Sequence, residues 1–189
     1  MGIPLIRSAL GQTTWFNDMD GNLATLEESF VARQNSDTSS VTVTGTTAET
    51  ALMASTTIPA NALAVGTVLR PWAAGSLTVA ASTTPTITFR LRWGGLGGVE
   101  LWTVSWSMGS SGSPYTNSWV KDLSVVCASV GGSGSVETDG WTGNGSGFFV
   151  SAPALATIDT TTSKVLLWTV QLSLSSASVT QRMMVVNKG

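Results

Sequence analysis

Residues 86–93 read Thr-Ile-Thr-Phe-Arg-Leu-Arg-Trp, and this stretch decides the fold class. Apolar side chains occupy every second position, from Ile87 to Trp93, and polar ones occupy the positions between. Because successive side chains of a β-strand point to opposite faces of its sheet, this two-residue period predicts a half-buried strand.

The same period recurs through the rest of the chain after residue 40. It is clear at 41–43, 102–108 and 166–174. Shorter strands are expected near 67–73, 76–80, 119–128, 134–138, 147–151 and 178–186. Glycine- and proline-rich turns are expected between strands, among them Pro59-Ala60-Asn61 and Gly75. No strand–helix alternation is visible, which argues against a parallel sheet. We therefore expect residues 40–189 to form an all-β domain, an antiparallel β-sandwich, with a jelly roll as the commonest eight-stranded solution.

Residues 1–36 differ from this body and predict an N-terminal attachment arm containing one short amphipathic helix. Apolar side chains recur at alternating spacings of three and four residues at Phe16, Met19, Leu23, Leu26 and Phe30. We expect Met19, Leu23, Leu26 and Phe30 to make contacts between copies of the chain. The seam is too short for an independent coiled coil, so a single helix packed on its own body is the alternative.

The segment before this helix is apolar without the period of a strand. Its large side chains are Ile3, Leu5, Ile6, Leu10, Trp15 and Phe16. Because apolar arms of this kind bury themselves against a partner, we expect these six residues to bind a capsid or another partner protein.

Composition restricts the function. The 189-residue chain carries a formal net charge of −2, with only 11% charged residues and no histidine. Nine scattered Lys and Arg argue against a nucleic-acid partner, and no apolar stretch is long enough to predict a membrane span. Without histidine, the Ser/His and Cys/His pairs of nucleophilic catalysis are unavailable. We expect a protein that is not an enzyme and that needs no cofactor.

Two groups of acidic residues are candidates for a catalytic site and a calcium site. Glu137 and Asp139 flank Thr138 in a glycine-rich stretch and are the only acid pair of the body that fits a glycosidase, although a solvated turn is the more ordinary interpretation. Asp18, Asp20 and Glu27 match part of a calcium-binding loop, but Phe16 stands where its first ligand belongs. We therefore interpret this second group as a helix start and expect no metal.

The eight tryptophans invite a carbohydrate-binding interpretation. Trp93, Trp102, Trp106 and Trp168 share the apolar phase of their strands and are expected in the core, whereas Trp72 and Trp119 stay unassigned. Trp141 and Asn144 are predicted in a polar loop, 139–145, as candidate contacts for a host-surface glycan. The alternative is that Trp141 folds back over a sheet.

Two stretches also carry a family resemblance over roughly residues 45–186. They are Thr56-Thr57-Ile58-Pro59-Ala60-Asn61-Ala62-Leu63-Ala64-Val65-Gly66-Thr67-Val68-Leu69-Arg70 and Thr86-Ile87-Thr88-Phe89-Arg90-Leu91-Arg92-Trp93-Gly94-Gly95, followed by Trp119-Val120-Lys121-Asp122-Leu123. This order resembles jelly-roll domains of tailed-phage virion proteins of the decoration, head-fibre, tail and minor structural types. The resemblance implies a β-sandwich, commonly trimeric, and transfers no catalytic residue.

The expected function is thus a non-enzymatic bacteriophage structural protein in the virion, most simply a homotrimeric capsid decoration protein. Its partners would be other copies of itself and the major capsid protein or another virion protein. The alternative is a carbohydrate-binding module of a tail, collar or head fibre. The strands are rich in hydroxyl groups and weakly charged, so their edges carry little charge repulsion against pairing with other chains. This favours an oligomer, in which a neighbouring subunit covers the edges.

Overall fold

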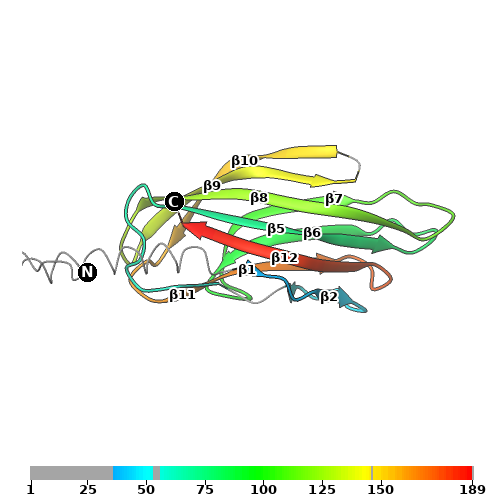
Figure 1. Ribbon diagram of the computed structural model, residues 1–189, viewed down its shortest axis with the longest axis horizontal. Coiled ribbons are helices and arrows are strands. Elements are labelled where there is room, and N and C mark those ends of the chain that lie inside the picture. The colour runs from blue at the N-terminus through cyan, green and yellow to red at the C-terminus, as the bar shows by residue number, and fades with distance from the viewer. Residues whose placement is uncertain (1–35, 53–55, 146, 189) are drawn as a thin grey trace, which may run out of the picture.

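The computed structural model describes residues 36–52, 56–145 and 147–188, and its regular structure there consists of β-strands in two antiparallel sheets (Figure 1). The seven-stranded sheet has the spatial order β1 (Ser36–Asp37), β12 (Ser178–Lys188), β5 (Val68–Val79), β8 (Tyr115–Ser129), β9 (Gly134–Asn144) and β10 (Gly147–Ile158), and β2 (Val41–Thr44) also pairs with β12. The five-stranded sheet has the order β3 (Thr50–Ala51), β11 (Lys164–Leu172), β6 (Thr86–Trp93) and β7 (Val99–Ser107), and β4 (Thr56–Ile58) also pairs with β11.

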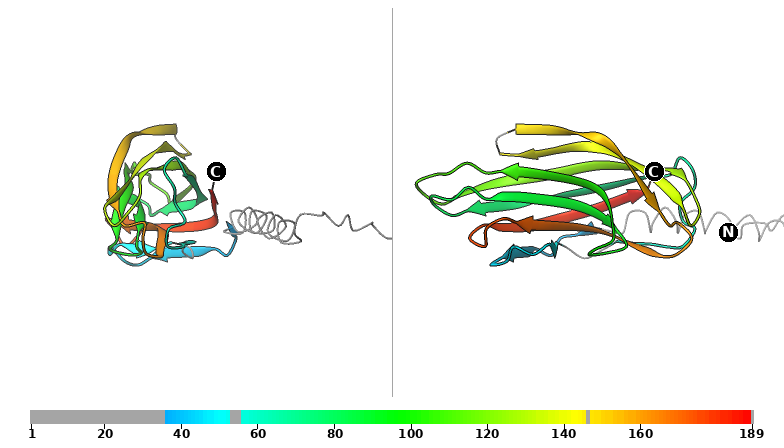
Figure 2. Two further views of the ribbon diagram at one scale, coloured as in Figure 1. Left: turned by 90° about the vertical axis from the view of Figure 1, so that its left-hand side faces the viewer. Right: turned by 180° about the vertical axis from the view of Figure 1, so that it is seen from behind.

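The two sheets form the layers of a sandwich, and the core lies between their inner faces (Figure 2). The strand predicted at 86–93 is confirmed with the same bounds, and its apolar side chains are buried. The four tryptophans assigned to the core by their phase, Trp93, Trp102, Trp106 and Trp168, are all buried. Trp119, which the sequence left unassigned, is buried as well, and its ring lies 5.0 Å from that of Phe89.

The predicted turn after residue 58 is also confirmed. Asn61 has a φ of 57°, and the backbone N–H of Ala62 donates to the carbonyl of Pro59. Ile58 and Leu63 on either side of this turn are buried.

The break predicted at Gly75, between strands at 67–73 and 76–80, is wrong. β5 runs through this glycine without interruption. A Cβ atom at Gly75 would lie 1.9 Å from the carbonyl oxygen of Thr180 and 2.9 Å from the Trp119 ring. The glycine therefore serves close approach of neighbouring groups inside the sheet, as a glycine within a strand commonly does.

The strand predicted at 166–174 ends earlier than expected. β11 stops at Leu172, and Leu174 lies in the following turn with 39% of its surface exposed, rather than in the core. The backbone N–H of Ser173 donates to Thr86, and beyond this bond the chain turns toward β12.

The arm predicted at 1–36 lies outside the described residues except for Ser36, the first residue of β1. The partner-binding and inter-copy residues assigned to it, Ile3 to Phe30, lie outside them too. In the described part, the chain begins beside the last strand, because Ser36 pairs with Val185 of β12.

Candidate functional site

The seven-stranded sheet has an outer face on which apolar side chains form a shallow groove. The alternation of β8 creates it: Trp119, Lys121 and Leu123 are buried on the inner face, whereas Ser118 and Val120 point outward. Across the sheet, Val120 is paired with Ala74 of β5 and with Gly143 of β9. These registers place the outward side chains of neighbouring strands side by side.

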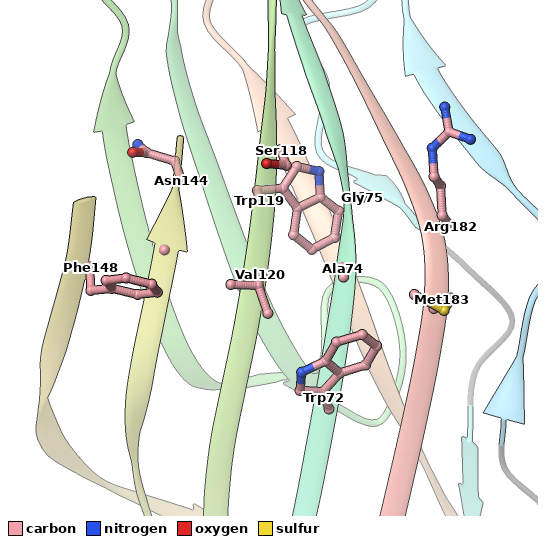
Figure 3. A pocket seen from close by; sticks show the side chains of 11 residues that line it. Trp72, Ala74, Gly75, Ser118, Trp119, Val120, Asn144, Phe148, Arg182 and Met183 are labelled. Atoms are coloured by element: carbon pink, nitrogen blue, oxygen red, sulfur yellow. The ribbon is translucent and has the colours of Figure 1, made fainter. Parts of the chain in front are cut away.

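The groove has a volume of about 430 Å³ (Figure 3). Its apolar walls come from Trp72, Val120, Phe148 and Met183. Figure 3 shows the Phe148 ring extending from β10 across β9 toward Val120. A Cβ atom at Gly143 would lie 2.8 Å from this ring, so the absence of a side chain there is what lets Phe148 lie over the sheet. We call this surface the outer groove.

Polar groups lie along one side of the outer groove (Figure 3). Ser118, Asn144 and Arg182 belong to its lining. Arg182 lies at an irregularity of β12, where the pairing with β5 shifts between Gln181 and Met183. The groove is therefore an aromatic and aliphatic surface with one cationic side chain and few hydrogen-bonding groups.

The predicted ligand loop at 139–145 is wrong as a loop, because β9 continues through Asn144. Trp141 is paired with Asp122 and Val150, and its ring packs edge-on against Phe148 at 5.4 Å between centroids. The alternative that Trp141 lies over a sheet is thus the correct one. Trp141 remains 36% exposed on the same face as the groove, and Asn144 lines the groove itself.

Sequence reasoning missed the other walls of the groove. Trp72 was left unassigned, and Phe148 was recognised only as part of a short strand. The side chains of Trp72, Val120 and Phe148 come together through the order of β5, β8, β9 and β10, which no local pattern carries. The sequence does carry one signal for the groove. Val120 falls between Trp119 and Lys121, which are buried, so the alternation of the strand places Val120 on the outer face.

The acidic pair Glu137 and Asp139 is exposed on strand β9 rather than in the turn that the sequence favoured. The Asp139 carboxylate accepts a hydrogen bond from the backbone N–H of Gly140. The calcium-loop candidate Asp18, Asp20 and Glu27 lies outside the described residues. Within the part of the chain that the structure describes, no group of three or more His, Cys, Asp or Glu side chains could hold a metal ion.

A second charged cluster lies on the outer face of the five-stranded sheet. Glu49 accepts hydrogen bonds from the Arg92 guanidinium and from the hydroxyl of Thr169, and Arg90 lies 3.0 Å from Glu100. The hydrogen bond from Arg92 lowers the pKa of Glu49 from 4.5 to about 2. Arg90 and Arg92 of β6 each contact both Glu49, which directly precedes β3, and Glu100 of β7, so the four side chains form one ion-pair network.

Lys121 is the third notable group, and it is fully buried in the core. Its side-chain nitrogen donates to the Thr142 hydroxyl at 2.5 Å and lies 4.1 Å from the centroid of Phe89. Burial lowers the pKa of Lys121 well below its usual range. A buried amine of this kind can act as a nucleophile only if a substrate reaches it, and the Lys121 side chain has no exposed surface.

No protein-family model matches the chain, and comparisons with curated proteins and with solved structures gave no significant match. In the described ranges, no helix has the length and apolar character to cross a membrane.

Proposed function

We propose that this protein is a non-enzymatic structural component of a tailed-phage virion, a capsid decoration protein whose N-terminal arm attaches the β-sandwich to the particle. The observation that carries the proposal is the strand order of the two sheets, which supports the jelly roll that the resemblance implies. The two stretches that carry the resemblance, 56–70 and 86–95, contain β4, the start of β5 and all of β6.

The strand order fits a jelly roll with one addition. One sheet contains the order β2-β12-β5-β8 and the other β4-β11-β6-β7. This order supports the jelly-roll interpretation, because two interleaved Greek keys of an eight-stranded jelly roll would have it. The hairpin β9–β10 is then an insertion between β8 and β11 that extends the first sheet. Figure 1 supports this interpretation, since the hairpin lies at one margin of the sandwich.

The positions of the apolar residues support different roles for the two parts of the chain, with the arm attaching the protein and the sandwich being displayed. The sandwich buries its own core, including Phe89 and Trp168, and needs no partner to do so. The apolar residues before position 36, such as Ile3 and Leu5, lack the period of a strand. In this proposal they bury themselves against the major capsid protein or another virion protein, and three copies act together.

Mass spectrometry of purified virions tests this proposal. A decoration protein is expected in copy numbers comparable to those of the major capsid protein. A few copies per particle would place it instead in a tail or collar. Absence from purified particles would contradict the virion assignment altogether.

The outer groove favours a second candidate, a carbohydrate-binding module of a tail, collar or head fibre. Trp72 and Phe148 offer aromatic surfaces, and Ser118, Asn144 and Arg182 offer polar groups to a host-surface glycan. Binding of the purified protein to host cells, lost in Trp72→Ala and kept in Trp15→Ala, would support this candidate. Equal binding by wild type and Trp72→Ala would contradict it.

A further inference from the structure

In the described part of the chain, the strand β10 forms an unpaired edge of the seven-stranded sheet. β10 ends the seven-stranded sheet, and within the described residues no strand pairs with its far side. Its twelve residues, Gly147–Ile158, include no Asp, Glu, Lys or Arg. An edge strand that is long, apolar and uncharged is a ready template for pairing with another chain, and natural sheets normally protect such edges.

The other sheet edges carry this protection. β1, β2, β3 and β4 are two to four residues long, which leaves little backbone to pair. β7 is longer, but it carries Glu100, which lies 3.0 Å from Arg90. Short strands and charged side chains are the usual devices against edge pairing. Of the described edges, that of β10 is therefore the one that is both long and uncharged.

β10 is divided by an irregularity, which identifies its accessible half. The pairing with β9 shifts between Ser151 and Ala154, and Pro153 in this interval has no backbone N–H to donate. The first half, Gly147–Ser151, is free of both features, and we call it the contact segment. Within it, 77% of Phe148 and 83% of Val150 is exposed, although both are large apolar side chains.

We propose that copies of this chain contact one another through the backbone edge of the contact segment, with the exposed Val150 as the apolar part of the interface. A second copy fits because an uncharged edge meets an identical edge without like-charge repulsion, and antiparallel strands can pair with themselves about a two-fold axis. Such a contact joins copies in pairs and is separate from the three-copy association proposed for the arm. A strand of a second copy at this edge would also lie beside Val150. The inference does not depend on the virion assignment, since it rests only on the composition and position of β10.

Thiol crosslinking of the full-length chain tests this contact. Val150→Cys places a thiol in the contact segment, and Leu96→Cys places a matched thiol at another exposed apolar residue, far along the chain in the β6–β7 turn. The native Cys127 is buried, and burial raises the pKa of its thiol, so it stays unreactive in the folded protein. A short reagent with two thiol-reactive ends tolerates differences in strand register.

We expect Val150→Cys to form covalent dimers roughly tenfold faster than Leu96→Cys at equal protein concentration, because association raises the effective concentration of the thiols. Adding Phe148→Lys should reduce the rate to that of Leu96→Cys, with an unchanged circular-dichroism spectrum. Equal rates for the two single variants would overturn the proposal. So would protection of the Val150→Cys thiol by phage particles without crosslinking between copies, since another protein would then cover this edge.

Discussion

The side-chain nitrogen of Lys121 lies 3.3 Å from the centroid of the Trp106 ring, inside the core of the sandwich. Phe89, Thr142 and the rings of Trp102 and Trp119 also surround this nitrogen. An ammonium over an aromatic ring gains about 2 kcal/mol when desolvated, whereas removing it from water costs several kcal/mol. The cost of desolvation is the larger of the two, which agrees with the lowered pKa of Lys121.

Replacing Lys121 with Met should therefore stabilise the protein at neutral pH, by about 1–3 kcal/mol. The Thr142 hydroxyl keeps a partner, because it also donates to the carbonyl of Val120. Urea unfolding at pH 7 measures the change. Lys188→Met, at an exposed position, is the control and should leave the free energy of unfolding nearly unchanged.

The pH dependence of wild type gives the same test a second readout. Because the pKa of Lys121 is lower in the folded state than in the unfolded state, the unfolded chain binds more protons between the two values. Wild-type stability should thus rise toward pH 10.5, and the gap to Lys121→Met should narrow. A Met variant that is less stable at every pH would mean that the ammonium is bound favourably.

Gly75→Ala should destabilise the sandwich by about 3 kcal/mol or more, because its Cβ would overlap the Thr180 carbonyl at 1.9 Å. Gly132→Ala is the matched control, since no atom lies within 4 Å of a Cβ there and its φ is not positive. Thermal melting of both variants measures the difference. Equal melting temperatures would contradict the close approach of β5 and β12 at this point.

Glu49→Gln should lower stability by roughly 1 kcal/mol at pH 7, because the ion pair with Arg92 lies near the surface. The folded-state pKa of Glu49 is lowered from 4.5 to about 2, so its contribution is complete above pH 4.5 and disappears as the pH falls toward 2. Denaturant titrations at several pH values should show wild type and variant converging in acid. Glu137→Gln, at an exposed position of β9, is the control and should leave the free energy of unfolding nearly unchanged at pH 7.

Trp168→Ala should cost about 3–5 kcal/mol, because a fully buried indole leaves a cavity when it is removed. Trp141→Ala removes an indole that is 36% exposed at the sheet surface and should cost much less. Chemical unfolding of the two variants compares core and surface tryptophans directly. Similar losses would contradict the placement of one of them.

The sequence predicted those parts of the fold that depend on local patterns. Alternation at 86–93 placed β6 and its buried face, and Pro59 with Asn61 marked a turn. The predictions of a break at Gly75 and of a loop at 139–145 are wrong, because glycine occurs in turns and also at close contacts inside a sheet. The outer groove was not predictable, since Trp72 and Phe148 meet only through pairings between distant strands.

The central claim is that residues before β1 attach the protein while the sandwich is displayed, and co-sedimentation with phage particles that lack the protein tests it most directly. Deleting residues 1–35 leaves β1, which begins at Ser36, and every strand after it in place. Several large apolar side chains buried per arm would contribute about 1.5–3 kcal/mol each, and association of three copies would multiply the effect. We predict that the full chain binds the particles and that the truncated chain, with the circular-dichroism spectrum of a folded β-protein, does not. Undiminished binding by the truncated chain would contradict the account and place the attachment surface on the sandwich.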